Sequence, residues 1–257
     1  MSFVEPWELA LLVAASLVAG TVDAIAGGGG LLTLPALLAT GMPAHLALGT
    51  NKGQSVFGAL AALVRFARAG MIDWHRARAA FPLGLLGSLG GAALVLWVPP
   101  SVLRPLVLVM LVGAAGYLLL RRSGPRLGQL TRTLPPRQRL LAAGGIALGL
   151  GLYDGFFGPG TGTFLILAFV AVFGDTLQKA SADAKVVNFA SNLAAVALFG
   201  SRGTILWWIS LPMAAGQLTG GWIGAQLAIK GGDVLVRRVV LGVVLALVVK
   251  IGWDLRG

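Results

Sequence analysis

Cysteine is absent from this sequence of 257 residues, and histidine occurs only twice, at His45 and His75. Without cysteine the chain has no disulfides, no thiolate metal sites and no cysteine nucleophile. The two histidines stand alone in the sequence, so we expect no metal site and no cofactor. An enzyme would also need a nucleophile beside a base. Since the sequence shows no such arrangement, it argues against an enzymatic function.

Charged residues are scarce as well. They make up 11% of the sequence against 57% hydrophobic residues, and the mean hydropathy is +0.87. This leaves too little polar surface for a soluble protein, and apolar segments of about 18–25 residues, the length that crosses a membrane, recur along the chain. They lie near 7–26, 45–66, 79–97, 102–120, 140–155, 182–200, 205–228 and 234–252. The sequence therefore predicts an all-α polytopic membrane protein with about eight transmembrane helices.

The first apolar segment is expected to remain in the protein. Met1–Glu8 carries two acids and no basic residue, whereas a cleaved signal peptide begins with a positively charged region.

The basic residues that produce the net charge of +11 gather beside the ends of the apolar segments. One group comprises Arg65, Arg68, Arg76 and Arg78, and a second occupies residues 121–139. Short basic loops remain in the cytoplasm by the positive-inside rule. We therefore interpret the charge as a signal of topology and of contact with anionic lipids, and not of nucleic-acid binding.

An internal duplication organises the chain. The basic linker 121–139 separates a first transmembrane repeat, residues 1–120, from a second, residues 140–257. The matching stretches are 23–29 with 154–160 and 51–74 with 184–207, and the second match pairs Lys52 with Lys185. Further on, Pro82, Gly90 and Gly91 match Pro212, Gly220 and Gly221. Three matches in the same order make chance similarity improbable, so we expect two homologous halves.

Both halves interrupt their first apolar segment with glycines, at Gly27–Gly30 and at Gly158–Gly162. Backbone that is not helical at membrane depth must face protein or water, because lipid cannot satisfy its N–H and C=O groups. Paired interruptions are typical of transporter binding sites, where helix N-termini point N–H groups at an anion. The alternative is that these glycines only allow close packing of helices. We predict interrupted or re-entrant half-helices here, with binding groups from Gly28, Gly29, Gly30, Gly160 and Gly162 and from the hydroxyls of Thr33, Thr161 and Thr163.

Ionisable residues also lie within apolar segments, namely Asp23, Lys52, Asp154, Asp183 and Lys185. A charge at the bilayer centre costs about 2.5–3.5 kcal/mol on insertion scales, so each should face a cavity or a partner. The two lysines are suited to neutralise a small dianion, or to pair with Asp23 and Asp154 when the site is empty. The three aspartates, together with Asn192, are candidates for coupling or gating.

Amide side chains share a helix face with these lysines. Asn188 lies three residues after Lys185 and Asn192 lies four residues further on, and in the first half Asn51 and Ser55, four residues apart, can share a face in the same way. Residues three or four apart meet on a helix surface, and amide N–H groups can donate hydrogen bonds to the oxygens of an anion. The alternative is that they only hold neighbouring helices together. We place Asn51 and Asn188 with both lysines among the substrate-binding residues.

The stretches DAIAGGGGLLTLPALLATG, LALGTNK, YDGFFGPGTGTF and KVVNFASN closely resemble the sulfite exporter TauE/SafE family, also called TSUP transporters. The resemblance covers nearly the whole chain. It implies a multi-pass transporter of the bacterial inner membrane with duplicated halves, whose relatives move sulfite, thiosulfate or organosulfonates such as sulfoacetate. The matching positions are Gly27–Gly30, Gly158–Gly162, Thr50–Lys52, Lys185 and Asn188.

We therefore expect a secondary transporter of small anions that works by alternating access at a midplane site between the repeats. The sequence contains no nucleotide-binding motif of the form GxxxxGK[ST]. Expected partners are the anion, membrane lipids and a coupling proton or other ion, with no nucleic acid and with a homo-oligomer left open. The alternative is an anion channel or facilitator, in which the same broken helices line a pore.

Two topologies satisfy the charge rule. If the interrupted regions are re-entrant, there are eight spans, both termini are cytoplasmic and the halves are parallel repeats. If the segments 31–41 and 161–173 cross the membrane, each half has five elements, the halves are inverted and the N-terminus lies outside. Both layouts keep residues 67–78 and 121–139 in the cytoplasm. We favour the eight-span layout.

Overall fold

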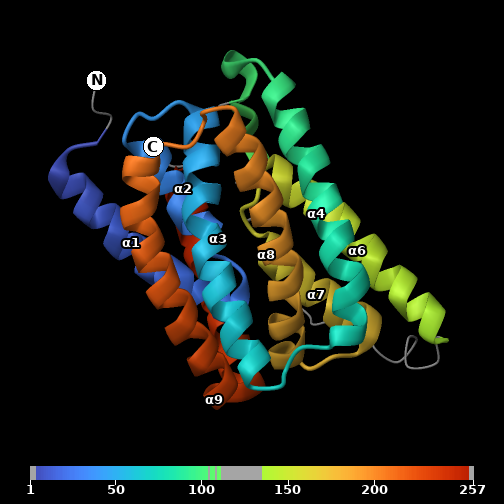
Figure 1. The fold of residues 1–257 in the computed structure, drawn as a ribbon. Helices are drawn as coiled ribbons and strands as arrows, with labels where there is room; N and C mark the ends of the chain where they lie inside the picture. Colours follow the sequence, from blue (N-terminus) through green and yellow to red (C-terminus); the bar gives the residue numbers. More distant parts are fainter. Residues whose placement is uncertain (1–3, 104, 108, 111–134, 255–257) are drawn as a thin grey trace.

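The computed structural model describes residues 4–103, 105–107, 109–110 and 135–254 (Figure 1). Within these residues the secondary structure is helical and contains no strand, which confirms the all-α prediction. Three of the described helices are apolar and long enough to cross a membrane, namely α1 (Pro6–Ala26), α4 (Trp74–Trp97) and α8 (Leu177–Ser201).

The remaining helices are α2 (Gly30–Ala39), α3 (Ala44–Arg68), α6 (Pro136–Phe156), α7 (Thr161–Phe173) and α9 (Trp207–Asp254). Helix α9 consists of two arms, because the backbone of Gly232 is not helical (φ 58°). The predicted apolar segments agree with these helices to within a few residues. The segment near 102–120 and the basic linker 121–139 fall largely outside the described residues.

Local sequence signals explain where α1 begins and ends. Pro6 opens the helix, where its missing N–H has no helical partner to lose, and Glu8 accepts a hydrogen bond from Glu5 N at 2.8 Å. At the other end Gly27 adopts φ 77°, a left-handed conformation that glycine favours, and its N–H donates to Asp23 O. Helix α1 therefore stops at the first glycine of the predicted break.

The breaks turn the first segment of each half into a hairpin of two helices. Val4 just before α1, Leu37 near the end of α2 and Ala44 at the start of α3 belong to one apolar cluster. Helix α2 therefore returns toward the end of the molecule from which α1 enters (Figure 1). In the same way, Ala143 early in α6 and Phe173 at the end of α7 share a second cluster. Each hairpin thus begins and ends toward the same end of the molecule, and the number of membrane spans stays a prediction.

Helices α3 and α8, whose sequences align between the halves, run in opposite directions. At one end Lys179 Nζ, at the start of α8, donates to Met71 O just after α3 (2.7 Å). At the other end Leu206 N, beyond α8, donates to Thr50 Oγ1 near the start of α3 (3.1 Å). The expected parallel arrangement of the halves is therefore wrong. Hydropathy could not reveal this, because it records how apolar a segment is and not whether the segment crosses the membrane or turns back.

The helices form two bundles, and each bundle draws on both halves of the sequence. Helices α1 and α3 pack mainly against α9, whereas α6 and α8 pack mainly against α4. We call α1–α3 with α9 the first bundle, and α4 with α6–α8 the second bundle. Packing is close because glycines lie at the contacts, where a Cβ on Gly220 would collide with Leu17 O.

The basic residues gather at one end of the molecule. Arg65 and Arg68 lie in the last turn of α3, and Arg76 and Arg78 lie in the first turns of α4. The start of α8 lies at the same end, where it contacts the α9 backbone just before Gly232. The positive-inside rule predicts that this end is cytoplasmic, so we call it the cytoplasmic end and the opposite one the outer end. The start of α1, with Glu5 and Glu8, lies at the outer end. The same rule therefore predicts an N-terminus outside the cell, which differs from the eight-span layout.

Candidate functional site

The two glycine breaks lie in direct contact inside the molecule. Thr163 N, in the first turn of α7, donates to Gly27 O at 3.2 Å, and Thr163 Oγ1 donates to Ala26 O at 2.8 Å. A Cβ on Gly27 would collide with the backbone of Gly162, so only glycine permits this approach. Because α1 belongs to the first bundle and α7 to the second, the contact joins the bundles.

Two ion pairs flank this contact. Lys52 Nζ lies 2.8 Å from Asp154 Oδ1, and the side chains are 4% and 3% exposed. Lys185 Nζ lies 2.7 Å from Asp23 Oδ2, and the lysine side chain is fully buried. Each pair joins a lysine from one half to an aspartate from the other. Each also joins the first bundle to the second. The structure thus shows the lysine–aspartate pairing that the sequence predicted as one of two roles for these lysines.

The two lysines approach the middle of the molecule from opposite ends. Lys52 lies eight residues after Ala44, the first residue of α3, and Lys185 lies eight residues after Leu177, the first residue of α8. Eight residues correspond to about 12 Å along a helix. Because α3 and α8 are antiparallel, the two ion pairs are placed on either side of the contact between the breaks.

Each carboxylate of these pairs has a second donor. Asp23 Oδ1 accepts a hydrogen bond from Gly29 N at 3.2 Å, and Asp154 Oδ2 accepts one from Ser191 Oγ. Lys185 Nζ also donates to Asp23 O at 2.5 Å. Buried charges are tolerated when they are paired and hydrogen-bonded in this way, and removing one partner costs about 3–5 kcal/mol.

A cavity of about 20 Å³ lies between the two pairs. It has room for about one water molecule, and it is too small for an oxyanion. An oxyanion therefore does not fit between the two pairs in this conformation, and it needs a lysine to leave its aspartate or the bundles to separate. The cavity is lined by Asp23, Gly27, Gly29, Gly30, Asn51, Lys52, Ser55, Asp154, Gly158, Gly162, Asn188, Asn192 and Gln217.

Several predicted binding residues do not line this cavity, namely Gly28, Thr33, Gly160, Thr161, Thr163 and Lys185. The three threonine hydroxyls are engaged elsewhere. Thr33 Oγ1 donates to Asn51 Oδ1 at 2.6 Å, and Thr161 Oγ1 donates to Gly158 O at 2.7 Å. Like Thr163, they hold the breaks and their neighbours in place.

Asp183 lies apart from the other predicted coupling residues. Its Oδ2 atom is 2.6 Å from Arg76 Nη2 and 2.8 Å from Lys179 Nζ, at the cytoplasmic end of the molecule. The sequence grouped Asp183 with the site because it is an ionisable residue in an apolar segment, but its side chain and that of Lys185 leave α8 toward different neighbours. Asp23, Asp154 and Asn192 do line the cavity.

Gln217 is a cavity residue that the sequence analysis missed. It lies in α9 among small residues whose pattern indicates helix packing, yet it is only 3% exposed. Its Oε1 atom would be within 3 Å of a Cβ placed on either Gly20 or Gly58. The oxygen is therefore held between α1 and α3. An amide inside a run of glycines and alanines was the available signal.

Within the described ranges, no group of three or more histidine or carboxylate side chains is placed to hold a metal ion. The polar groups at the cavity are amides, hydroxyls, backbone N–H groups and two lysine–aspartate pairs. This chemistry suits an anion that accepts several hydrogen bonds.

Comparison with known proteins gives consistent results. The model of the family described as "Sulfite exporter TauE/SafE" matches residues 12–251. A probable membrane transporter protein of Haemophilus influenzae is 40% identical over 249 residues, which are 96% of this chain and 95% of the relative. The probable membrane transporter protein YfcA of Escherichia coli K12 is 37% identical over 99% of this chain and 93% of its own length. The probable membrane transporter protein ORF9 of a Sinorhizobium species is 36% identical, over 96% and 93%. No solved structure matches the chain.

Proposed function

Since this chain belongs to the sulfite exporter TauE/SafE family of membrane transporters, we propose that it is a secondary carrier of small sulfur-containing oxyanions in the bacterial inner membrane. The anions are of the sulfite, thiosulfate and sulfoacetate class, and transport proceeds by alternating access. The observation that carries this proposal is the pair of buried lysine–aspartate contacts that bridge the two bundles at the glycine breaks.

The ends of two helices add to the anion preference. Gly30 begins α2 and Gly162 lies in the first turn of α7, and both line the cavity. The first turn of a helix presents free N–H groups and a partial positive charge. The amides of Asn188 and Gln217 face the same space. An oxyanion has several oxygens, so it can accept hydrogen bonds from both helix ends and an amide at once.

The carboxylates make the site electrically neutral when it is empty. An anion can pair with Lys52 only if the carboxylate of Asp154 moves away from the lysine. Breaking this ion pair costs the least free energy if Asp154 takes up a proton at the same time. The proton then compensates the charge of the entering anion. In our proposal Asp23 and Asp154 are therefore the coupling groups, and anion and proton move in the same direction.

A carrier fits the geometry better than a channel. The space between the pairs holds about 20 Å³, and both pairs, together with the Thr163–Gly27 hydrogen bond, join the bundles across it. Rocking of one bundle against the other would expose the site to one side and then to the other, as inverted halves allow.

The experiment is uptake of labelled sulfite, thiosulfate and sulfoacetate into proteoliposomes. We expect saturable uptake of at least one anion, and loss of that uptake in Lys52→Ala and Lys185→Ala. The matched control is Lys230→Ala, which removes the same charge from an exposed position. Unchanged uptake in both site variants would remove these lysines from the binding site.

The same vesicles separate the mechanisms. Uptake that accelerates when the anion is present on the opposite side, and that is driven by an inward proton gradient, supports a proton-coupled carrier. Large single-channel currents in planar bilayers would instead show that the broken helices line a pore.

A further inference from the structure

The start of α8 reaches across from the second bundle to the first at the cytoplasmic end. Gln178 Nε2 donates to Ala228 O and to Ile229 O, both at 2.9 Å, and Gln178 N donates to Asp233 Oδ1 at 2.8 Å. Both carbonyls lie near the end of the first arm of α9, just before Gly232. Carbonyls at a helix end lack helical partners, so Gln178 supplies donors that this end needs.

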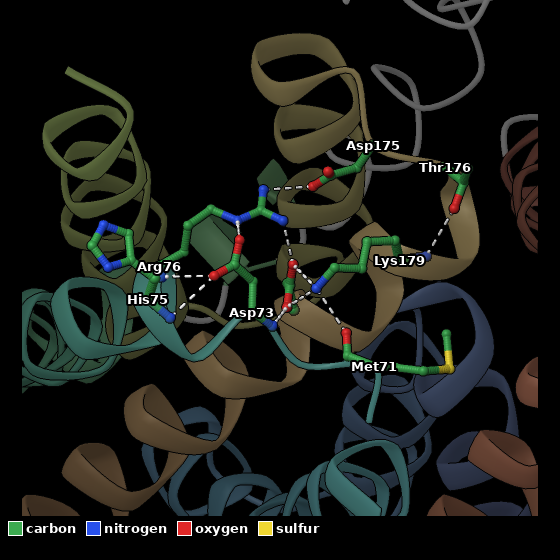
Figure 2. A network of polar contacts seen from close by, with 8 residues as sticks. Met71, Asp73, His75, Arg76, Asp175, Thr176 and Lys179 are labelled. Atoms are coloured by element: carbon green, nitrogen blue, oxygen red, sulfur yellow. Dashed lines mark hydrogen bonds and ion pairs between the residues drawn. The ribbon is translucent and has the colours of Figure 1, made fainter. Parts of the chain in front are cut away.

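A network of charges holds the chain on both sides of Gln178 (Figure 2). Arg76 Nε lies 2.8 Å from Asp73 Oδ2, and Arg76 Nη1 lies 2.6 Å from Asp175 Oδ2. Arg76 Nη2 lies 2.6 Å from Asp183 Oδ2. Asp175 precedes α8 and Asp183 lies in its second turn, so one guanidinium fixes the segment that carries Gln178. Lys179 Nζ also bonds Asp183 and Met71 O.

The ion pairs of this network are shielded from solvent, so they contribute to the stability of this end of the molecule. The side chain of Arg76 is 12% exposed and that of Asp183 is 6% exposed, whereas fully exposed pairs contribute little. Partial burial alone would raise the pKa of Asp73, but hydrogen bonds and charge from Arg76 outweigh it and hold that pKa below its ordinary value. Removing Arg76 would leave three carboxylates close together without their common partner.

Among the residues that the structure describes, the outer end has no such network at the equivalent place. The alignment of the halves pairs Asp183 with Thr50 and Asp73 with Leu206. At the cytoplasmic end Asp73 N donates to Asp183 Oδ1 at 2.8 Å, and at the outer end Leu206 N donates to Thr50 Oγ1 at 3.1 Å. The backbone contact is the same, but the charges are present at the cytoplasmic end alone. The two ends are thus held closed by different means.

We propose that the first turns of α8 form the cytoplasmic gate of the transporter, in which Gln178 is the latch between the bundles and Arg76 is the residue that positions the latch. This rests on the proposed alternating access, because a gate is needed only if the central site opens to the cytoplasm. A cavity of about 310 Å³ lies directly beside the network and is lined by Asp73, His75, Arg76, Arg139, Leu140, Phe173, Asp175 and Lys179. It provides the space into which residues 175–179 move when the gate opens.

The test uses the natural absence of cysteine. Ser55 lines the central cavity, so a single Ser55→Cys substitution reports access to it. Inside-out membrane vesicles are treated with a membrane-impermeant maleimide, which reaches Cys only through the cytoplasmic end. We expect Gln178→Ala and Arg76→Ala to raise the labelling rate about tenfold, because each removes hydrogen bonds that hold the start of α8 in place.

The matched control is Arg78→Ala, which removes an exposed arginine two positions further along α4 and should leave the labelling rate unchanged. Arg76→Lys keeps the positive charge, but an ammonium cannot contact three carboxylates in the geometry of the guanidinium. The labelling rate of this variant should therefore lie between those of the parent and Arg76→Ala. If Arg76→Ala does not fold, Gln178→Ala, whose side chain is only half-buried, decides the matter alone.

Unchanged labelling in a folded Gln178→Ala protein would overturn the gate. The measurement needs no transported anion, so it is independent of the uptake experiment. Altered labelling with no uptake of any sulfur anion would reject the proposed substrate and keep the gate, and the reverse result would reject the gate and keep the substrate.

Discussion

At the scale of single residues, Lys52 and Asp154 serve stability and binding together. Both side chains are almost completely buried, and within the described part of the chain Lys52 forms an ion pair with Asp154 alone. A buried charge without its partner is costly, whereas removing both partners is often nearly neutral. Stability and transport should therefore respond differently to single and double substitutions.

We predict that Lys52→Ala lowers the free energy of unfolding by about 3–5 kcal/mol, because it leaves Asp154 buried and unpaired. The double variant Lys52→Ala/Asp154→Ala should regain most of this stability and still fail to transport. Thermal unfolding in detergent measures the first effect, and vesicle uptake measures the second. A double variant as unstable as the single one would show that the lysine stabilises the fold by other contacts.

How far the sequence could predict the site is clearest from three residues. The lysine–aspartate pairing was predictable, because charges in apolar segments need partners and two of each recur at matching positions. Gln217 was not, because a lone amide among small residues looks like helix packing. Asp183 was grouped with the site because it is an ionisable residue in an apolar segment, whereas the place that its side chain reaches depends on the neighbouring helices.

At the scale of elements, the two hairpins meet through glycines. A Cβ on Gly162 would lie 2.5 Å from Gly27 Cα, and the hydrogen bond from Thr163 N to Gly27 O requires this approach. The cavity lies against this contact and includes both glycines. A change here should therefore affect packing and binding together.

We predict that Gly162→Ala lowers the stability by about 1–3 kcal/mol, the usual cost of overpacking, and reduces uptake. Gly149→Ala in α6 is the control, because nothing lies within 4 Å of a Cβ at that position. Gly149→Ala should leave the free energy of unfolding unchanged or raise it by up to about 1 kcal/mol, since glycine is a poor helix former. Melting temperatures of both variants compare the two sites directly. Equal effects would mean that the contact between the breaks tolerates a side chain.

The helix boundaries were predictable from apolar segments, and their arrangement was not. Glycines marked the ends of α1 and α6 correctly, because non-helical backbone must be shielded from lipid. Helix α4 comes from the first half and packs in the second bundle, whereas α9 comes from the second half and packs in the first bundle. The hydropathy of the sequence does not indicate this arrangement. The opposite directions of α3 and α8 likewise appear only through contacts such as Lys179 with Met71 O.

At the scale of the whole molecule, the charges and the inverted halves agree on one orientation. Arg65, Arg68, Arg76 and Arg78 lie at the cytoplasmic end, and Arg202 lies beyond the outer end of α8. The loop between α2 and α3 is at the same outer end, since Ala44 and Phe199 share an apolar cluster.

We predict that single cysteines at Thr40 and Arg202 react with an impermeant maleimide added outside intact cells, and that a cysteine at Arg78 reacts only in inside-out vesicles. The positive-inside rule predicts that the end of the molecule with the arginines faces the cytoplasm and that the opposite end faces outward. The cysteine-free parent protein gives the background signal. Labelling of Thr40→Cys only from the cytoplasm would reverse the orientation.

Asp23 and Asp154 belong to the protein itself, so they stay beside the two lysines when no anion is bound. In the proposed transport cycle, each lysine regains an aspartate partner in the opposing bundle after the anion leaves, so that no unpaired ammonium remains in the interior. We therefore expect the carrier to return to its starting conformation without binding a second anion, and net transport in one direction should not require exchange.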